Sequence, residues 1–117
     1  MAGRGDVVWA PDPFKSEGGN PRPWLIVSDE QLPYSTAESI GVAFTTQSHH
    51  PGSFAVPETA WARGNPDAQS YVLPWTVATL KDDVHVVGIQ GTVTDSFTDR
   101  VTAALVSYLD TPSDVRE

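Results

Sequence analysis

Short apolar runs alternate with polar segments rich in proline and glycine along the chain. Most of these runs are shorter than an ordinary helix and are rich in β-branched and aromatic residues, so the pattern predicts strands. The predicted strands are Asp6–Ala10, Trp24–Ser28, Ile40–Thr46, Tyr71–Leu80 and His85–Gly91, with a further strand beginning at Ala55–Val56.

The breaks between these strands are marked by residues that cannot continue a sheet. Proline has no amide hydrogen for a strand ladder, so Pro11 and Pro13 end the first strand. Pro74 interrupts or bends the strand in which it lies. The predicted connections are the loops Pro11–Pro23 and Ala62–Gln69 and the turn Lys81–Asp83, all of them polar.

The spacing of apolar residues changes near the C-terminus. From Thr94 onward they recur at intervals of three and four, which predicts one amphipathic helix that ends before Pro112. Thr94, Asp95 and Ser96 are candidates for its N-cap. The chain is therefore expected to form a mainly β fold, a small barrel-like sheet capped by a C-terminal helix. We expect a single domain over residues 1–111 and a frayed tail over 112–117.

Composition and charge narrow the class of protein. The 117 residues carry a formal net charge of −8, and the two lysines are Lys15 and Lys81. An acidic surface with so little lysine suits a salt-rich cytoplasm, in which repulsion between charges is screened. An acidic protein from a mesophile is the alternative, and we expect a halophilic, archaeal source. Broad electrostatic binding to nucleic acid is disfavoured, because a basic patch is missing.

Other classes of protein and of site are disfavoured by what the sequence lacks. The chain has no cysteine, which excludes disulfides and zinc–thiolate sites. No apolar run approaches the ~18 residues of a membrane span, and no signal peptide is visible. We therefore expect a soluble cytoplasmic protein with no membrane partner.

Several motifs, in order along the first half of the chain, resemble the MazF/PemK family of type II toxin–antitoxin toxins. Gly5-Asp6 precedes the first strand, and a loop containing Gly18-Gly19 ends in Arg22-Pro23 before the apolar strand that closes on Ser28. A later strand ends in Phe44-Thr45. The resemblance weakens beyond Gly52. Its specificity comes from the order and spacing of the motifs together.

The resemblance implies a small SH3-like barrel of the MazF/PemK type, usually a homodimer. Such proteins are endoribonucleases that need no metal and no other cofactor, and they cut single-stranded RNA at short sequences by attack of the 2′-OH. The resemblance extends to nucleic-acid binding in general, of RNA and of DNA. A cognate antitoxin neutralises the toxin by laying an extended tail along the RNA groove.

Arg22 is the first candidate catalytic residue. An arginine is always charged and offers a planar fork of donors to phosphate oxygens. Pro21 and Pro23 restrict the backbone on both sides, which orients the side chain in advance, as electrostatic stabilisation of a transition state requires. The alternative is an arginine that only pairs with a carboxylate at the base of a loop.

Thr45 is the second candidate catalytic residue, because the family places a threonine or serine at this strand end, where its hydroxyl can donate to a phosphate oxygen. Thr46 is expected to point to the opposite face of the strand, so that only one of the two matters. Phe14, Lys15 and Trp24 are expected to contact RNA by stacking and by charge, and Gln47 and His49 complete the set. The loop that carries Phe14 and Lys15 suits a mobile flap over a groove.

The groups that move protons are less determined by the sequence. Some family members have an arginine and a carboxylate on the strand matching Ser70–Trp75, where this chain has Tyr71, Leu73 and Trp75. The titratable residues left are Asp6, Glu17, His49, His50 and His85. Asp6 is expected to anchor a turn and His85 to be structural in a strand. The histidine pair could transfer protons, or it could simply be solvated.

Two other functions remain open, because fold does not fix function. One is a non-catalytic SH3-like barrel that binds a peptide or nucleic acid in its groove without cutting it, a reading favoured by the missing strand carboxylate. The other is an interaction protein that works only through its dimer surface.

Overall fold

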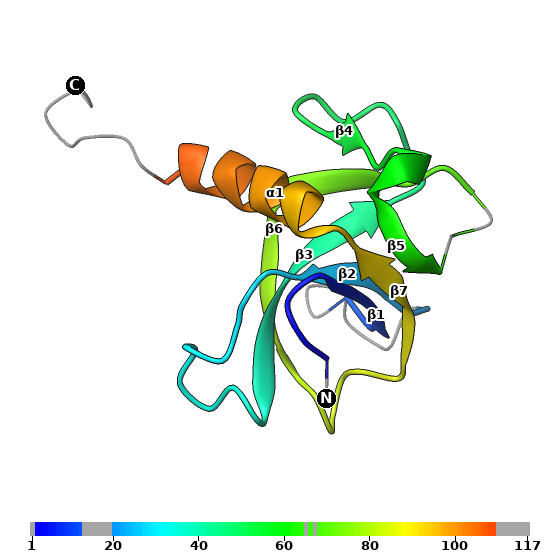
Figure 1. Cartoon of the computed structure of the whole chain (residues 1–117). Coiled ribbons are helices and arrows are strands. Elements are labelled where there is room, and N and C mark those ends of the chain that lie inside the picture. The colour runs from blue at the N-terminus through cyan, green and yellow to red at the C-terminus, as the bar shows by residue number, and fades with distance from the viewer. Residues whose placement is uncertain (1, 13–19, 65, 67, 110–117) are drawn as a thin grey trace, which may run out of the picture.

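The computed structural model describes residues 2–12, 20–64, 66 and 68–109. Within these ranges the chain forms seven strands and one α-helix, with a single turn of 3-10 helix at Glu58–Ala60 (Figure 1). The strands are β1 (Asp6–Ala10), β2 (Arg22–Ile26), β3 (Glu38–Thr45), β4 (Phe54–Ala55), β5 (Trp61–Gly64), β6 (Tyr71–Lys81) and β7 (Gly88–Val93), and the helix is α1 (Asp95–Ser107).

The strands form one antiparallel sheet in the order β4-β6-β3-β2-β1-β7-β5. The sheet curls strongly, so that its two halves face each other, and α1 lies along one side (Figure 1). β4 and β5 are its edges. The mainly β fold with a C-terminal helix that the sequence predicts is confirmed, as a curled half-barrel.

Both faces of the central strands are buried. Because successive side chains of a strand point to opposite faces, Val7 and Val8 belong to different apolar clusters, as do Trp24 and Leu25. The first cluster contains Val7, Leu25, Val42, Phe44 and the helix residues Phe97 and Val101; the second contains Val8, Trp24, Ile26, Ala43 and Leu80. Burial on both faces explains why these strands read as continuous apolar runs.

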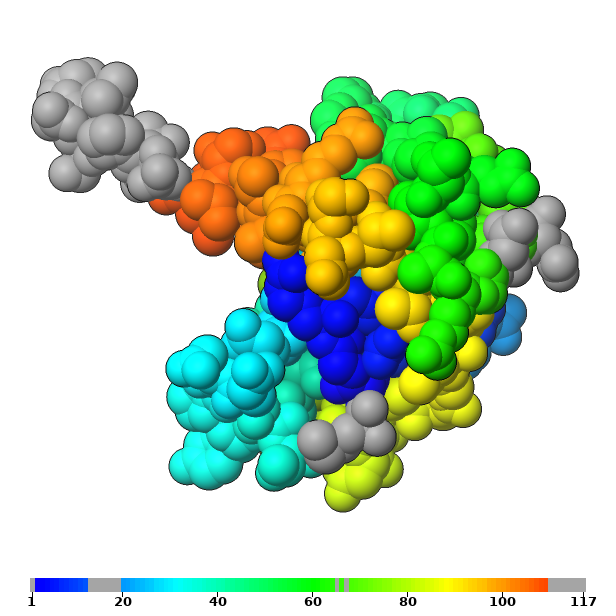
Figure 2. All heavy atoms as spheres, viewed as in Figure 1, coloured from blue at the N-terminus to red at the C-terminus, as the bar shows by residue number. Residues whose placement is uncertain are grey.

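The helix begins and packs as its spacing predicts. The Thr94 side chain caps it, its Oγ1 accepting a hydrogen bond of 3.2 Å from the Phe97 amide. Phe97 and Val101 are buried, and the Phe97 ring meets Phe54 edge-on. Figure 2 shows α1 on the outside of the molecule, with its C-terminal end extending past the sheet. No helix in the described ranges combines the length and the apolar character that a membrane crossing requires.

The predicted loop over Ala62–Gln69 is wrong in its first part, because β5 pairs with β7 through Trp61↔Val93 and Gly64↔Gly91. Two glycines let these strands approach closely: a Cβ on Gly91 would lie 2.4 Å from the Arg63 carbonyl oxygen. Tertiary contact with β7 thus makes a strand out of a segment whose composition favours a loop.

Two smaller expectations concern Pro74 and His85. β6 runs unbroken through Pro74, so the strand is not interrupted there, and the β3–β6 register shifts between Val42 and Phe44. The prediction that His85 lies in a strand is wrong. It lies in the turn before β7, where its Nδ1 accepts a hydrogen bond of 2.9 Å from the Lys81 amide.

Candidate active site

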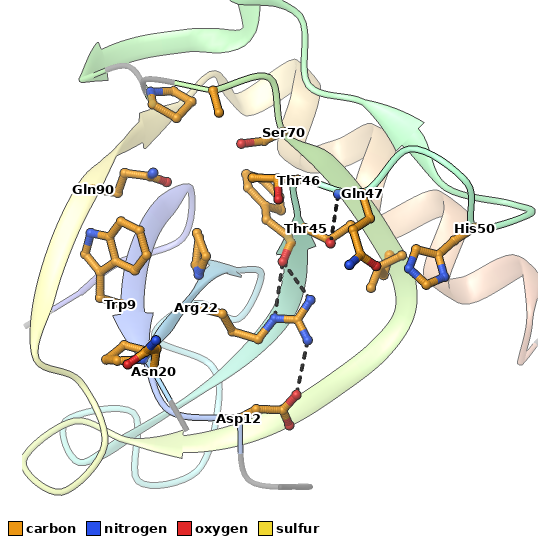
Figure 3. A pocket seen from close by; sticks show the side chains of 16 residues that line it. Trp9, Asp12, Asn20, Arg22, Thr45, Thr46, Gln47, His50, Ser70 and Gln90 are labelled. Atoms are coloured by element: carbon orange, nitrogen blue, oxygen red, sulfur yellow. Dashed lines mark hydrogen bonds and ion pairs between the residues drawn. The ribbon is translucent and has the colours of Figure 1, made fainter. Parts of the chain in front are cut away.

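A groove of about 760 Å³ opens where the ends of β1, β2, β3 and β6 meet a bulged part of β7 (Figure 3). Charged, hydroxyl and amide side chains gather in it from segments far apart in the sequence. Its polar lining among the described residues consists of Asp12, Asn20, Arg22, Thr45, Thr46, Gln47, His50, Ser70 and Gln90, with the Trp9 indole beside them.

Arg22, the first residue of β2, lies in the middle of this lining (Figure 3). Its Nε and Nη2 both donate to the carbonyl oxygen of Phe44, at 3.2 and 2.8 Å. Its Nη1 donates to Asp12 Oδ2 at 3.1 Å. The backbone between two prolines therefore places a guanidinium that is tied on two sides and still 24% exposed.

The sequence analysis missed Asp12 as a site residue. Its side chain is only 10% exposed and forms the ion pair with Arg22. The register of the β1–β2 pair explains why Asp12 lies next to Arg22. Ala10 of β1 pairs with Arg22 of β2, so the residues just after β1 lie beside the start of β2. Arg22 does pair with a carboxylate, as the alternative to a catalytic role had it, and both members of the pair line the groove.

The prediction that Trp24 stacks on RNA bases is wrong. The residue is fully buried, and its indole N–H donates to the Ala10 carbonyl at 3.1 Å. Arg22 and Trp24 lie on the same face of β2 because they are two residues apart, with the Arg22 Cζ 5.8 Å from the indole centroid. Trp24 therefore packs beneath the Arg22 side chain and is not accessible to a ligand.

Thr45 and Thr46 lie at the point where β3 ends, and both line the groove. The expectation that Thr46 points to the opposite face is wrong, because strict alternation ends with the strand. Thr45 Oγ1 accepts a hydrogen bond of 3.2 Å from the Gln47 amide, which fixes the hydroxyl near the guanidinium side of the groove (Figure 3). Gln47, which the sequence analysis predicts to contact RNA, also lines the groove.

His49 and His50 lie further along the connection from β3 to β4. His49, predicted to contact RNA, is exposed and lies outside the groove lining, whereas His50 lines the groove. The rings stack with centroids 4.4 Å apart, so His49 supports His50 from outside. The predicted RNA contacts Phe14 and Lys15 lie outside the described residues, as does Glu17.

Three of the residues considered for proton transfer are placed away from the groove or have other partners. Asp6 anchors the turn before β1, as predicted: Oδ2 accepts from the Gly3 amide and Oδ1 from the Thr92 hydroxyl, both at 2.8 Å. His85 lies in its turn and His49 outside the groove. Among the side chains that the structure describes, Asp12 and His50 are the titratable groups lining the groove beside Arg22. No three His, Asp or Glu residues of the described ranges could together hold a metal ion.

Trp9, Asn20, Ser70 and Gln90 were also missed by the sequence analysis. They enter the groove from β1, the start of β2, the start of β6 and β7. No local signal marks them, because each becomes a site residue only through the pairing of distant strands.

Comparisons with known proteins find the same fold in solved structures. A mycobacterial endoribonuclease in complex with its cognate antitoxin is 25% identical, with a TM-score of 0.68 and 95% of each chain covered. A further mycobacterial endoribonuclease structure is 25% identical with a TM-score of 0.69, covering 95% of this chain and 93% of that one.

A MazE–MazF structure from Deinococcus radiodurans shares the fold at 18% identity, with a TM-score of 0.69 and coverage of 96% of this chain and 98% of that one. A search of curated protein sequences gives no significant match. The family model described as the PemK-like, MazF-like toxin of type II toxin–antitoxin systems matches residues 3–109. This chain belongs to that toxin family.

Proposed function

We propose that this chain is a toxin that cuts single-stranded RNA without a metal ion, and that a cognate antitoxin neutralises it. Family membership and the likeness to endoribonucleases support this proposal. The observation that carries the mechanism is the Arg22 guanidinium, held in an open groove that Thr45 also lines. Because RNA is the substrate, the cytoplasm is the compartment of action, and a homodimer is the expected assembly.

The reaction transfers a phosphodiester linkage within one RNA chain. The 2′-oxygen loses its proton and attacks phosphorus, the bond from phosphorus to the 5′-oxygen breaks, and the leaving oxygen takes up a proton. The products end in a 2′,3′-cyclic phosphate and a 5′-hydroxyl. Negative charge grows on the phosphoryl oxygens in the transition state, where fixed donors stabilise it most.

Arg22 can stabilise this negative charge because its hydrogen-bond donors are shared between two acceptors, the Phe44 carbonyl and Asp12. Nε and Nη2 hold the Phe44 carbonyl, which fixes the plane of the guanidinium. Nη1, which donates to Asp12, is the donor that a phosphate oxygen competes for. A substrate phosphate thus takes the place of a carboxylate that already marks an anion position. Thr45 adds a neutral donor to the same linkage.

Asp12 and His50 are the candidates for moving the two protons, since they are the titratable side chains that line the groove within the described residues. Either group could accept the 2′-OH proton or donate to the leaving oxygen. Separate pH–rate profiles of Asp12→Asn and His50→Gln would assign the two roles, because each variant removes one limb of the profile.

A non-catalytic groove is the second candidate function, and the closed Arg22–Asp12 pair favours it. Nε and Nη2 of the guanidinium donate to the Phe44 carbonyl, and Nη1 donates to Asp12. A groove that bound a peptide or an RNA without cutting it would leave that pair in place.

Cleavage of a short RNA by the purified chain separates the two functions. The substrate carries a fluorophore at each end, EDTA is present, and mass spectrometry identifies the product termini. We expect products with a 2′,3′-cyclic phosphate, loss of cleavage in Thr45→Val and retention in Thr45→Ser. Binding without any cleavage at all salt concentrations would reject the nuclease in favour of the binding module.

A further inference from the structure

Pro23 occupies an unusual place for a proline, the second residue of the central strand β2. Because proline has no amide hydrogen, sheets usually hold it on edge strands, at first residues or at bulges. The β2–β3 register pairs Trp24 with Ala43, and the next step of that register sets Pro23 opposite Phe44. The missing amide therefore leaves a backbone acceptor on β3 that needs another donor, since buried carbonyls are nearly always paired.

The hydrogen bonds between β2 and β3 show which acceptor this is. The Val27 amide donates to the Ile40 carbonyl at 3.0 Å. In an antiparallel ladder such bonds join every second pair of residues, so Leu25 and Pro23 also direct their backbone groups toward β3. An amide at position 23 would thus donate to the Phe44 carbonyl. Proline has none, and the backbone of β2 leaves that carbonyl to another donor.

The Arg22 side chain supplies the donors that Pro23 lacks. Its Nε and Nη2 reach the Phe44 carbonyl oxygen at 3.2 and 2.8 Å (Figure 3). A carbonyl oxygen has two lone pairs, and these two hydrogen bonds occupy both. An amide hydrogen at position 23 would compete for the same oxygen and displace at least one of the two. The guanidinium thus keeps its orientation because the residue next to it donates nothing.

We propose that Pro23 is a positioning residue for Arg22, and that it acts because its backbone donates no hydrogen bond to Phe44. This inference rests on the proposed function, because it concerns the guanidinium that stabilises the RNA phosphate. Two donors on one acceptor fix the plane of the guanidinium and direct Nη1 toward the groove, where it contacts Asp12. With one of these hydrogen bonds lost, the side chain moves more freely and stabilises the transition state less well.

The test compares two residues at position 23 that differ in one group. Pro23→Ala introduces the amide hydrogen, whereas lactic acid at this position has the same methyl group and an ester oxygen instead of the N–H. Both chains lose the pyrrolidine ring and its restriction of the backbone, so the difference between them reports the amide donor. Both can be assembled by chemical ligation at Ala37, an exposed position between β2 and β3.

Cleavage kinetics, measured below the Tm of each chain, give the first readout. We expect Pro23→Ala to lower kcat by about ten- to a hundredfold, as for a displaced catalytic group, with little change in KM. Its Tm should stay near that of the wild type, because a new ladder hydrogen bond offsets the greater freedom of the unfolded chain. The lactic acid chain should cleave at close to the wild-type rate. Equal rates for the two chains, whether slow or fast, would overturn the inference.

Pro33→Ala is the matched control for the loss of a proline ring. Pro33 is exposed in the connection between β2 and β3 and lies outside the groove lining, so this variant should keep the wild-type kcat. A loss of kcat in Pro33→Ala as large as in Pro23→Ala would overturn the inference, because it would trace the effect to the loss of any proline.

Nuclear magnetic resonance gives a readout that needs no RNA. In Pro23→Ala the new amide should show scalar coupling across a hydrogen bond to the Phe44 carbonyl carbon. The Nε hydrogen of Arg22 should exchange with water faster than in the wild type, and in the lactic acid chain this exchange should stay slow. Absence of the coupling, or unchanged exchange, would overturn the inference, and cleavage by the wild type would then leave the nuclease standing. Both signals in a chain that cuts no RNA would support the positioning of the guanidinium and reject the nuclease alone.

Discussion

Replacing Arg22 by alanine tests the site at two levels, because the structure gives this side chain both a stabilising and a catalytic role. The change removes two hydrogen bonds to the Phe44 carbonyl and the ion pair with Asp12. The carboxylate left behind is 10% exposed, so water reaches it poorly. Arg22→Ala should therefore destabilise the fold as well as abolish cleavage.

The size of each effect follows from these contacts. An acceptor left unpaired costs about 1–3 kcal/mol, and breaking a buried ion pair about 3–5 kcal/mol. Because the guanidinium is 24% exposed, solvent screening weakens the ion pair, and we place the combined loss of unfolding free energy below the sum of these two figures. That loss is roughly 2–4 kcal/mol, or a fall in Tm of about 8–16 °C for a domain of this size. Losing an arginine that stabilises a phosphoryl transition state should slow cleavage by about 10³-fold or more.

The assay measures Tm by circular dichroism and then cleavage of a fluorescent RNA at least ten degrees below the Tm of the variant. Arg22→Ala/Asp12→Asn is the matched control, because it also removes the negative charge of Asp12. The double variant should regain part of the stability and none of the cleavage. A folded Arg22→Ala that cuts within tenfold of the parent rate would refute the catalytic role. An unchanged Tm would refute the structural one.

Three further predictions concern the core, a strand contact and the surface charge. Trp24→Ala should lower the unfolding free energy by about 3–5 kcal/mol in chemical denaturation, because the indole is fully buried; a loss under about 1 kcal/mol would contradict that burial. Gly91→Ala should separate β5 from β7, since its Cβ would lie 2.4 Å from the Arg63 carbonyl oxygen, and faster amide exchange in β5 would report it. Cleavage should rise with added salt, because a net charge of −8 repels RNA at low ionic strength; a maximum at low salt in a folded sample would count against this.

Local patterns in the sequence determined most of the secondary structure. Apolar runs bounded by proline and glycine predicted most of the strands, and intervals of three and four predicted α1, because both signals come from the backbone period of one element. The choice of Arg22 and Thr45 as candidate residues rested on the resemblance to the MazF/PemK family as well as on their positions, between two prolines and at a strand end. Both residues line the groove.

The tertiary structure alone decided the surroundings of these two residues. Asp12 meets Arg22 because β1 pairs with β2 in one register, and Trp24 is buried because β2 lies inside the sheet. Gln90 enters the groove through a bulge that depends on how β7 pairs with β1. Pairing register and sheet order are set by contacts between residues far apart in the chain, and such contacts leave no periodic trace in a sequence. The sequence could thus name the central arginine and threonine, whereas the groove around them exists only once distant strands have paired.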